Sequence, residues 1–157
     1  MNITKLSVVI PAFNEEATIH KILDKIREVE LVNDIKKEII IVNDCSTDDT
    51  EGAIKRYIEN NSLLDIKYFK HEINKGKGAA LRTGISKATG EFLIIQDADL
   101  EYDPNEYNFL LKPVLLGFAD VVYGSRFMGS HPHRVLFFWH TIGNKFLTFL
   151  SNAFTNL

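Results

Sequence analysis

The segment from Phe92 to Pro104 joins four apolar residues to a run of alternating carboxylates. The apolar residues Phe92–Ile95 are typical of a strand that is buried on both faces of a sheet. The acidic residues follow as Asp97, Asp99, Glu101 and Asp103. Because burying unpartnered carboxylates costs several kcal/mol each, we expect these side chains at or beyond the end of the strand. The chain must therefore fold so that a buried strand ends at a polar edge.

Two interpretations of this acidic run remain open from its residues alone. Asp97 and Asp99 are two residues apart, so in extended chain their side chains point to the same side. Two such carboxylates, together with phosphate oxygens from a ligand, form a suitable shell for Mg2+ or Mn2+. The alternative is a solvated acidic turn, followed by a helix that Asp103 caps and Pro104 begins.

Length and composition are those of one soluble domain. The chain has 157 residues, of which 45% are hydrophobic and 25% charged. The net charge of -3 argues against nucleic acid as the main partner. A single cysteine, Cys45, excludes an intrachain disulfide, and no signal peptide or long apolar segment is visible. We therefore expect a cytoplasmic protein, and the cytoplasmic face of a membrane also remains open.

Strand patterns alternate with helix patterns along the chain. Besides Phe92–Ile95, strands are expected at Leu6–Pro11, Glu38–Val42, Ile66–Phe69 and Asp120–Gly124. The first helix is expected to open at Asn14–Glu16, and Ser46 or Thr47 is expected to cap the second. This order predicts an α/β fold with a mainly parallel central sheet and helices on both faces.

Polar clusters directly follow four of the expected strands. They are Ala12–Glu15, Asn43–Ser46, Gln96–Glu101 and Ser125–Arg126. In parallel sheets ligands bind beyond the carboxyl ends of the strands, so these clusters should meet at one edge and form a ligand site. The ligand is not a dinucleotide in a Rossmann site, because no GxGxxG follows the first strand, and NKGKG does not match a P-loop.

Five motifs occur in order along the chain: PAFNEE, VNDCSTDDT, NKGKGAALRTG, QDADLEYDP and YGSRF. Together they resemble the family 2 inverting glycosyltransferases, and in particular the dolichol-phosphate mannosyltransferase and polyprenyl-phosphate glycosyltransferase branch. The resemblance implies the GT-A fold, which binds nucleotide sugars. It implies such a domain over residues 1–130, followed at 131–157 by an aromatic-rich amphipathic helix that either covers the sheet or lies at a membrane surface.

The resemblance also implies roles for individual residues of this sequence. The base and ribose are expected at Pro11, Phe13 and Glu15, and Asp44 is expected to read the nucleobase edge with Val42 against the base. Asp97, Ala98 and Asp99 match the DxD motif for metal and diphosphate, with Glu101 as a third metal ligand. Basic residues near the diphosphate are Arg126 and Arg134, and Lys77 is a further phosphate contact. Asp99 and Arg126 are the expected catalytic residues.

The implied function is metal-dependent, inverting transfer of a sugar from a UDP- or GDP-sugar, with Mg2+ or Mn2+ as cofactor. The implied acceptor is a polyprenyl phosphate or a glycan, while a membrane surface and a homo-oligomer remain open as partners. The alternative from another class is a non-catalytic module that binds a nucleotide sugar or assists assembly.

Overall fold

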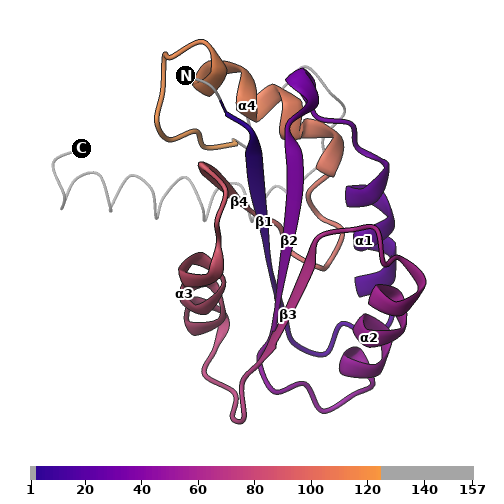
Figure 1. Ribbon diagram of the computed structural model, residues 1–157. Coiled ribbons are helices and arrows are strands. Elements are labelled where there is room, and N and C mark those ends of the chain that lie inside the picture. The colour runs from indigo at the N-terminus through magenta and orange to yellow at the C-terminus, as the bar shows by residue number, and fades with distance from the viewer. Residues whose placement is uncertain (1–2, 125–157) are drawn as a thin grey trace, which may run out of the picture. The chain divides into compact units, whose positions relative to one another are not determined.

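The computed structural model describes residues 3–124 of the chain, and contacts group Met1–Val122 into one compact unit. Its centre is a four-stranded, fully parallel sheet (Figure 1). The strands are β1 (Lys5–Ala12), β2 (Lys36–Asn43), β3 (Ile66–Lys70) and β4 (Phe92–Ile95), in the spatial order β3-β2-β1-β4. Four of the five expected strands are therefore confirmed, together with the α/β fold class. The expected burial of Phe92–Ile95 on both faces is wrong, because β4 is an edge strand of the described sheet and Leu93 and Ile95 on one of its faces are exposed.

Helices cover both faces of the sheet, as predicted. One face packs against α1 (Ile19–Glu28), α2 (Thr50–Asn60) and α4 (Tyr107–Leu115), and α3 (Lys77–Lys87) packs on the other (Figure 1). Two short 3-10 helices, Val32–Asp34 and Pro104–Glu106, precede β2 and α4. The alternation of β1 explains this division, because Val8 and Ile10 join the core of the three helices while Val9 joins the smaller cluster under α3.

The strand order creates a switch point beside β1. From β1 the chain builds β2 and β3 on one side, and then returns through α3 to place β4 on the other side. The strand order therefore reverses beside β1, with β2 on one side of it and β4 on the other. Open α/β sheets bind ligands beyond the carboxyl ends of the strands, at the point where the strand order reverses.

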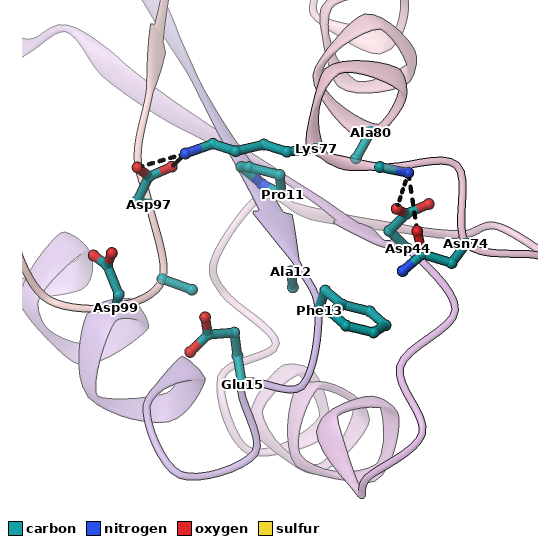
Figure 2. A pocket seen from close by; sticks show the side chains of 12 residues that line it. Pro11, Ala12, Phe13, Glu15, Asp44, Asn74, Lys77, Ala80, Asp97 and Asp99 are labelled. Atoms are coloured by element: carbon teal, nitrogen blue, oxygen red, sulfur yellow. Dashed lines mark hydrogen bonds and ion pairs between the residues drawn. The ribbon is translucent and has the colours of Figure 1, made fainter.

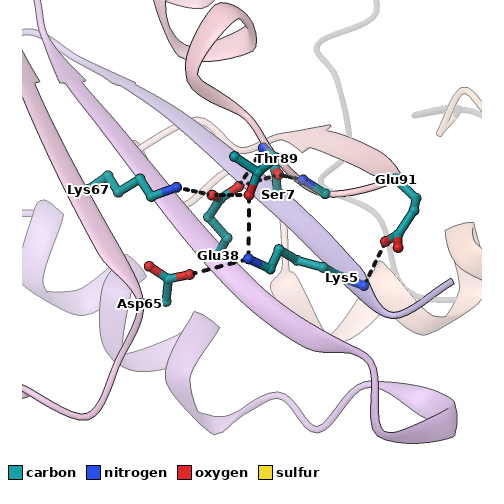
Figure 3. A network of polar contacts seen from close by, with 8 residues as sticks. Lys5, Ser7, Glu38, Asp65, Lys67, Thr89 and Glu91 are labelled. Atoms are coloured by element: carbon teal, nitrogen blue, oxygen red, sulfur yellow. Dashed lines mark hydrogen bonds and ion pairs between the residues drawn. The ribbon is translucent and has the colours of Figure 1, made fainter.

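A buried polar network holds the amino-terminal half of the sheet to the segment between α3 and β4 (Figure 3). Glu38 is fully buried and accepts hydrogen bonds from Ser7 Oγ at 2.6 Å, Thr89 Oγ1 at 2.7 Å and Thr89 N at 2.9 Å, and it also pairs with Lys67. Burial alone would raise the pKa of Glu38, but these hydrogen bonds lower it to about 2. The carboxylate is thus ionised and fully partnered at neutral pH.

Two helix starts differ from the prediction. Asn14 has φ of 57°, in the left-handed region, so Asn14–Glu16 lie in a turn and α1 begins only at Ile19. The second helix begins at Thr50, with Asp49 rather than Ser46 or Thr47 at its N-cap. In both cases the polar residues bond to one another across the two loops instead of capping a helix.

The strand predicted at Asp120–Gly124 is wrong. These residues are irregular, and Val121 is exposed. A short apolar run forms a strand only where a neighbouring strand completes the hydrogen bonds, and within the described residues the sheet ends at β4. By contrast, Asp103 caps the 3-10 helix Pro104–Glu106 by accepting a hydrogen bond from Asn105 N, which is the helix start described by the alternative interpretation of the acidic run. Within residues 3–124, no helix is long and apolar enough to cross a bilayer.

Candidate functional site

A pocket of about 320 Å³ opens at the carboxyl ends of the strands (Figure 2). This volume lies within the range of small-molecule sites. Residues from the ends of β1, β2 and β4 and from the start of α3 line it: Pro11, Ala12, Phe13, Glu15, Asp44, Asn74, Gly76, Lys77, Ala80, Asp97, Ala98 and Asp99. Three of the four predicted polar clusters therefore meet at one edge of the sheet, and the fourth, Ser125–Arg126, lies outside the described residues.

One end of the pocket is acidic. Asp97 and Asp99 both follow β4, and Glu15 lies near them in Figure 2. Lys77 Nζ lies 2.7 Å from both carboxylate oxygens of Asp97. The side chain of Lys77 is 59% exposed and that of Asp97 is 20% exposed, so this ion pair lies at the mouth of the pocket.

The loop that carries these carboxylates is braced from inside. Gln96 is 1% exposed, and its Nε2 donates to the carbonyl oxygens of Asp97 and Tyr102, each at 3.1 Å. Its Oε1 accepts a hydrogen bond of 2.7 Å from the hydroxyl of Tyr107 on α4. Burial raises the pKa of Tyr107, which keeps its hydroxyl protonated as a donor. The acidic loop is therefore held by hydrogen bonds between its own residues and by one hydrogen bond to α4.

The other end of the pocket is aromatic. Phe13 is 46% exposed and lines the pocket, so its ring is available for stacking. Asn14 holds this turn in place: its backbone N–H donates to Ser46 Oγ at 3.0 Å, and its Oδ1 accepts from Thr47 N at 2.8 Å. Glu15 N likewise donates to Thr50 Oγ1 at 2.8 Å. These bonds join the loops after β1 and β2 and fix the position of the ring.

Asp44 joins β2 to the loop before α3. Its carboxylate is almost fully buried and accepts hydrogen bonds from Lys75 N at 3.0 Å and Gly76 N at 2.6 Å. His71 Nδ1 lies 2.6 Å from Asp44 Oδ1, and His71 Nε2 lies 2.9 Å from Thr83 Oγ1. Desolvation alone would raise the pKa of Asp44, but these bonds lower it overall. The carboxylate thus organises the lysine-glycine loop in addition to lining the pocket.

Most of the predicted binding residues meet in this pocket. It contains Pro11, Phe13, Glu15, Asp44, Lys77, Asp97, Ala98 and Asp99. Val42 differs from the prediction, because it is fully buried beneath α3 with Val9, Ile40 and Ala80 and does not line the pocket. Glu101 is exposed and lies outside the lining, and its backbone N–H donates to Asp99 Oδ1 at 3.0 Å. Arg126 and Arg134 lie outside the described residues.

Several pocket and supporting residues were not predicted from the sequence: Asn74, Gly76, Ala80 and His71. Ala12 and Gln96 lie in predicted clusters, but the bracing role of the Gln96 side chain was not predicted. The sequence NKGKG before α3 could have indicated Asn74 and Gly76 as pocket residues. A glycine-rich turn that leads into a helix N-terminus is a common anion site, because unpaired backbone N–H groups face the ligand there.

The residues of the acidic end fit a divalent cation only in part. Asp97 and Asp99 supply the hard carboxylate oxygens that Mg2+ and Mn2+ prefer. Among the described residues, no three side chains of histidine, cysteine, aspartate or glutamate are grouped to hold a metal ion by themselves. The donor set therefore fits a cation that completes its shell with oxygens from a ligand or from water.

Comparisons with known proteins agree with this geometry. A dolichyl-phosphate beta-glucosyltransferase of Dictyostelium discoideum is 33% identical over 110 residues, which are 66% of this chain and 33% of that protein. A mannosyltransferase from Pyrobaculum calidifontis, solved with GDP-Man and Mn2+, matches with a TM-score of 0.57 and 32% identity, over 63% of this chain and 28% of its own.

Glucosyl-3-phosphoglycerate synthase from Mycobacterium tuberculosis, solved with Mn2+, UDP and glucosyl-3-phosphoglycerate, matches with a TM-score of 0.56 and 29% identity, over 71% of this chain and 40% of its own. The chain thus spans about a third of the length of these proteins. These solved relatives are glycosyltransferases of the GT-A fold. The family model described as glycosyl transferase family 2 matches residues 7–151, and the chain therefore belongs to this family.

Proposed function

We propose that this chain forms the donor site of a hexosyltransferase that moves a sugar from a nucleoside diphosphate sugar to the phosphate of a polyprenyl phosphate, with inversion at the anomeric carbon. The observation that carries the proposal is the division of one pocket into two ends (Figure 2). One end has the ring of Phe13 beside Asp44, whose carboxylate is already hydrogen-bonded to His71 and to the loop before α3, and the other end has Asp97 and Asp99. A nucleoside diphosphate has the same division, since a planar base is joined through a ribose to an anionic diphosphate. We assign the base to Phe13 and the diphosphate to the region of Asp97, Asp99 and Lys77.

The start of α3 supports the diphosphate assignment. Gly76, at the N-cap, has φ of 83° and no side chain to cap the first turn, and Gly76, Lys77 and Ala80 all line the pocket. The first backbone N–H groups of a helix lack partners within the helix, and the helix dipole favours negative charge at this end. A phosphate group in this pocket would therefore meet backbone donors and the ammonium group of Lys77.

Asp97 and Asp99 would hold the divalent cation, with diphosphate oxygens completing its shell. When bound, the cation supplies positive charge that stabilises the leaving diphosphate. The protein's own residues would orient the donor: Phe13 against the base, Lys77 at the phosphates, and the Gln96–Tyr107 brace holding the acidic loop in place. Glu101 remains a proposed third ligand from the resemblance alone, because this residue is exposed and lies outside the pocket lining.

In the proposed reaction, a phosphate oxygen of the acceptor attacks the anomeric carbon from the side opposite the diphosphate. One carbon–oxygen bond forms while the bond to the donor's terminal phosphate breaks, and the nucleoside diphosphate leaves with the electron pair. A phosphate monoester has its second pKa near 6, so at neutral pH the acceptor is already largely ionised and needs little help from a general base. The dolichyl-phosphate enzyme of Dictyostelium, by its name, supports an acceptor of this class.

Calorimetric titration with UDP, GDP and CDP, each with and without Mn2+, tests the donor site. We expect one nucleoside diphosphate to bind with micromolar affinity in the presence of the metal ion, and more weakly without it. GDP and UDP are the first choices, because the solved relatives contain them. Failure of all three to bind with Mn2+ present would remove the basis of the proposal.

The acceptor requires a separate experiment. Sugar transfer from a labelled donor is compared for a short polyprenyl phosphate, the corresponding polyprenyl alcohol and an oligosaccharide. We expect transfer to the phosphate alone, while transfer only to the oligosaccharide would replace the lipid acceptor by a glycan. Nucleotide binding without transfer to any acceptor would favour a non-catalytic binding module. Because the proposed acceptor is a membrane lipid, we also expect activity at a membrane surface.

A further inference from the structure

The ammonium group of Lys77 and the proposed metal ion would bind the same carboxylate. Lys77 Nζ lies 2.7 Å from Oδ1 and 2.7 Å from Oδ2 of Asp97, so it contacts both oxygens that a cation would use (Figure 2). A second cation beside this ammonium group would meet strong electrostatic repulsion at such a distance. Metal binding at Asp97 therefore requires Lys77 to move.

Lys77 is also placed to reach a second anionic partner. It is the first residue of α3, beside the uncapped N-terminus to which we assign the diphosphate. Its side chain is 59% exposed, and exposed ion pairs contribute little to stability. The lysine stem is long and flexible, so the ammonium group can exchange one partner for another without a change in the backbone. Asp97 and the start of α3, to which we assign the diphosphate, both line the same pocket.

We infer that Lys77 makes metal binding depend on the nucleotide: it neutralises Asp97 until a nucleoside diphosphate attracts it away and leaves the carboxylate to the metal ion. This inference rests on the proposed donor site and concerns its regulation. Two sites coupled in this way influence each other reciprocally, so the metal ion must also strengthen nucleotide binding by the same factor. Lys77 would add to the coupling that arises from direct contact between the metal ion and the diphosphate.

The test is a thermodynamic cycle on the purified chain. Calorimetry measures the affinity for Mn2+ alone, for UDP or GDP alone, and for each in the presence of the other. The Lys77→Met variant keeps the length of the side chain and removes its charge. We expect it to bind Mn2+ alone about fivefold more tightly than the unchanged protein, because the competitor for Asp97 is gone. We also expect the coupling factor between Mn2+ and the nucleotide to fall about fivefold.

Lys75→Met is the matched control. Lys75 lies in the loop two residues before Lys77, and its side chain is exposed. It does not line the pocket, and no ion pair of this side chain is found among the described residues. The control removes the same charge close to Lys77 in the chain, so a general electrostatic effect would appear in both variants. We expect Lys75→Met to leave both the Mn2+ affinity and the coupling factor unchanged.

The outcomes separate this inference from the proposed function. Unchanged Mn2+ affinity in Lys77→Met, or an equal gain in Lys75→Met, overturns the role of Lys77 while the donor site stands. If the coupling factor between Mn2+ and the nucleotide in Lys77→Met equals that of the unchanged protein, the role of Lys77 is likewise overturned while the donor site stands. If the unchanged protein binds neither UDP nor GDP in the presence of Mn2+, the proposed function fails and this inference fails with it.

Discussion

His71 Nδ1 lies 2.6 Å from Asp44 Oδ1, and this contact joins the end of β2 to the loop that leads into α3. Both side chains are nearly buried, and the same carboxylate accepts hydrogen bonds from the backbone of Lys75 and Gly76. Asp44, the residue that follows β2, therefore positions the start of α3 and with it Lys77.

Replacing His71 should disturb both the fold and the site. In His71→Phe, Asp44 loses one donor in a buried setting, and we expect the free energy of unfolding to fall by about 1–3 kcal/mol. We also expect nucleotide affinity to fall severalfold, because the loop that carries Lys77 loses an anchor. Urea denaturation and calorimetry measure the two effects. Thr83→Val, which removes only the outer hydrogen bond of His71, should have a smaller effect on both. Full nucleotide affinity in a destabilised His71→Phe would show that the pair does not position the loop.

The buried Glu38 should make the fold sensitive to acid. Its pKa of about 2 lies below the ordinary value of 4.5, so the ionised group stabilises the fold above about pH 4.5, and this stabilisation is lost as the pH falls toward 2. The contribution is on the order of 2 kcal/mol, allowing for solvent screening of the half-exposed Lys67.

Urea denaturation of the unchanged protein and of Glu38→Gln between pH 7 and pH 3 measures this contribution. The variant should be less stable at pH 7, and the difference between the two proteins should shrink below about pH 4. Glu59→Gln, at an exposed position on α2, is the control and should follow the unchanged protein. A difference that stays constant down to pH 3 would mean that Glu38 is not the acid-sensitive group.

Gly84 lets α3 approach the sheet. A Cβ atom at this position would lie 2.4 Å from Val9 Cγ1, which is closer than packed atoms can come. Gly84→Ala should therefore push the helix away from β1 and lower the free energy of unfolding by about 1–3 kcal/mol. Gly78→Ala in the same helix is the matched control, since a Cβ atom there meets nothing within 4 Å. The control should be neutral or stabilising, because alanine favours helix over glycine. Equal effects of the two changes would contradict the close packing at Gly84.

The sheet could be predicted from the sequence because its strands are marked by apolar runs that end at a polar residue. In β1 and β2 these runs are buried on both faces, whereas β4 lies at the edge of the sheet and exposes Leu93 and Ile95 although Phe92–Ile95 is entirely apolar. The meeting of the polar clusters at one edge also followed, because parallel strands place all their carboxyl ends on one side.

The details that were not predicted depend on contacts between distant residues. Asn14 looks like a helix cap in sequence, but its bonds to Ser46 and Thr47, more than 30 residues away, hold it in the left-handed region. The His71–Asp44 contact leaves no local pattern either. The predicted strand at Asp120–Gly124 failed for the same reason, since a strand depends on a neighbour that the local sequence does not specify.

The central claim is that Asp97 and Asp99, with a divalent cation, bind the diphosphate of a nucleotide sugar. The most direct measurement is the calorimetric affinity of Asp99→Asn for UDP and GDP, with and without Mn2+. Asp103→Asn is the matched control, because Asp103 lies in the same acidic run and asparagine caps a helix about as well as aspartate. We expect Asp99→Asn to lose at least about tenfold in nucleotide affinity with Mn2+ present and to respond no longer to the metal ion, while Asp103→Asn keeps both properties. Unchanged nucleotide affinity and an unchanged metal requirement in Asp99→Asn would contradict the central claim.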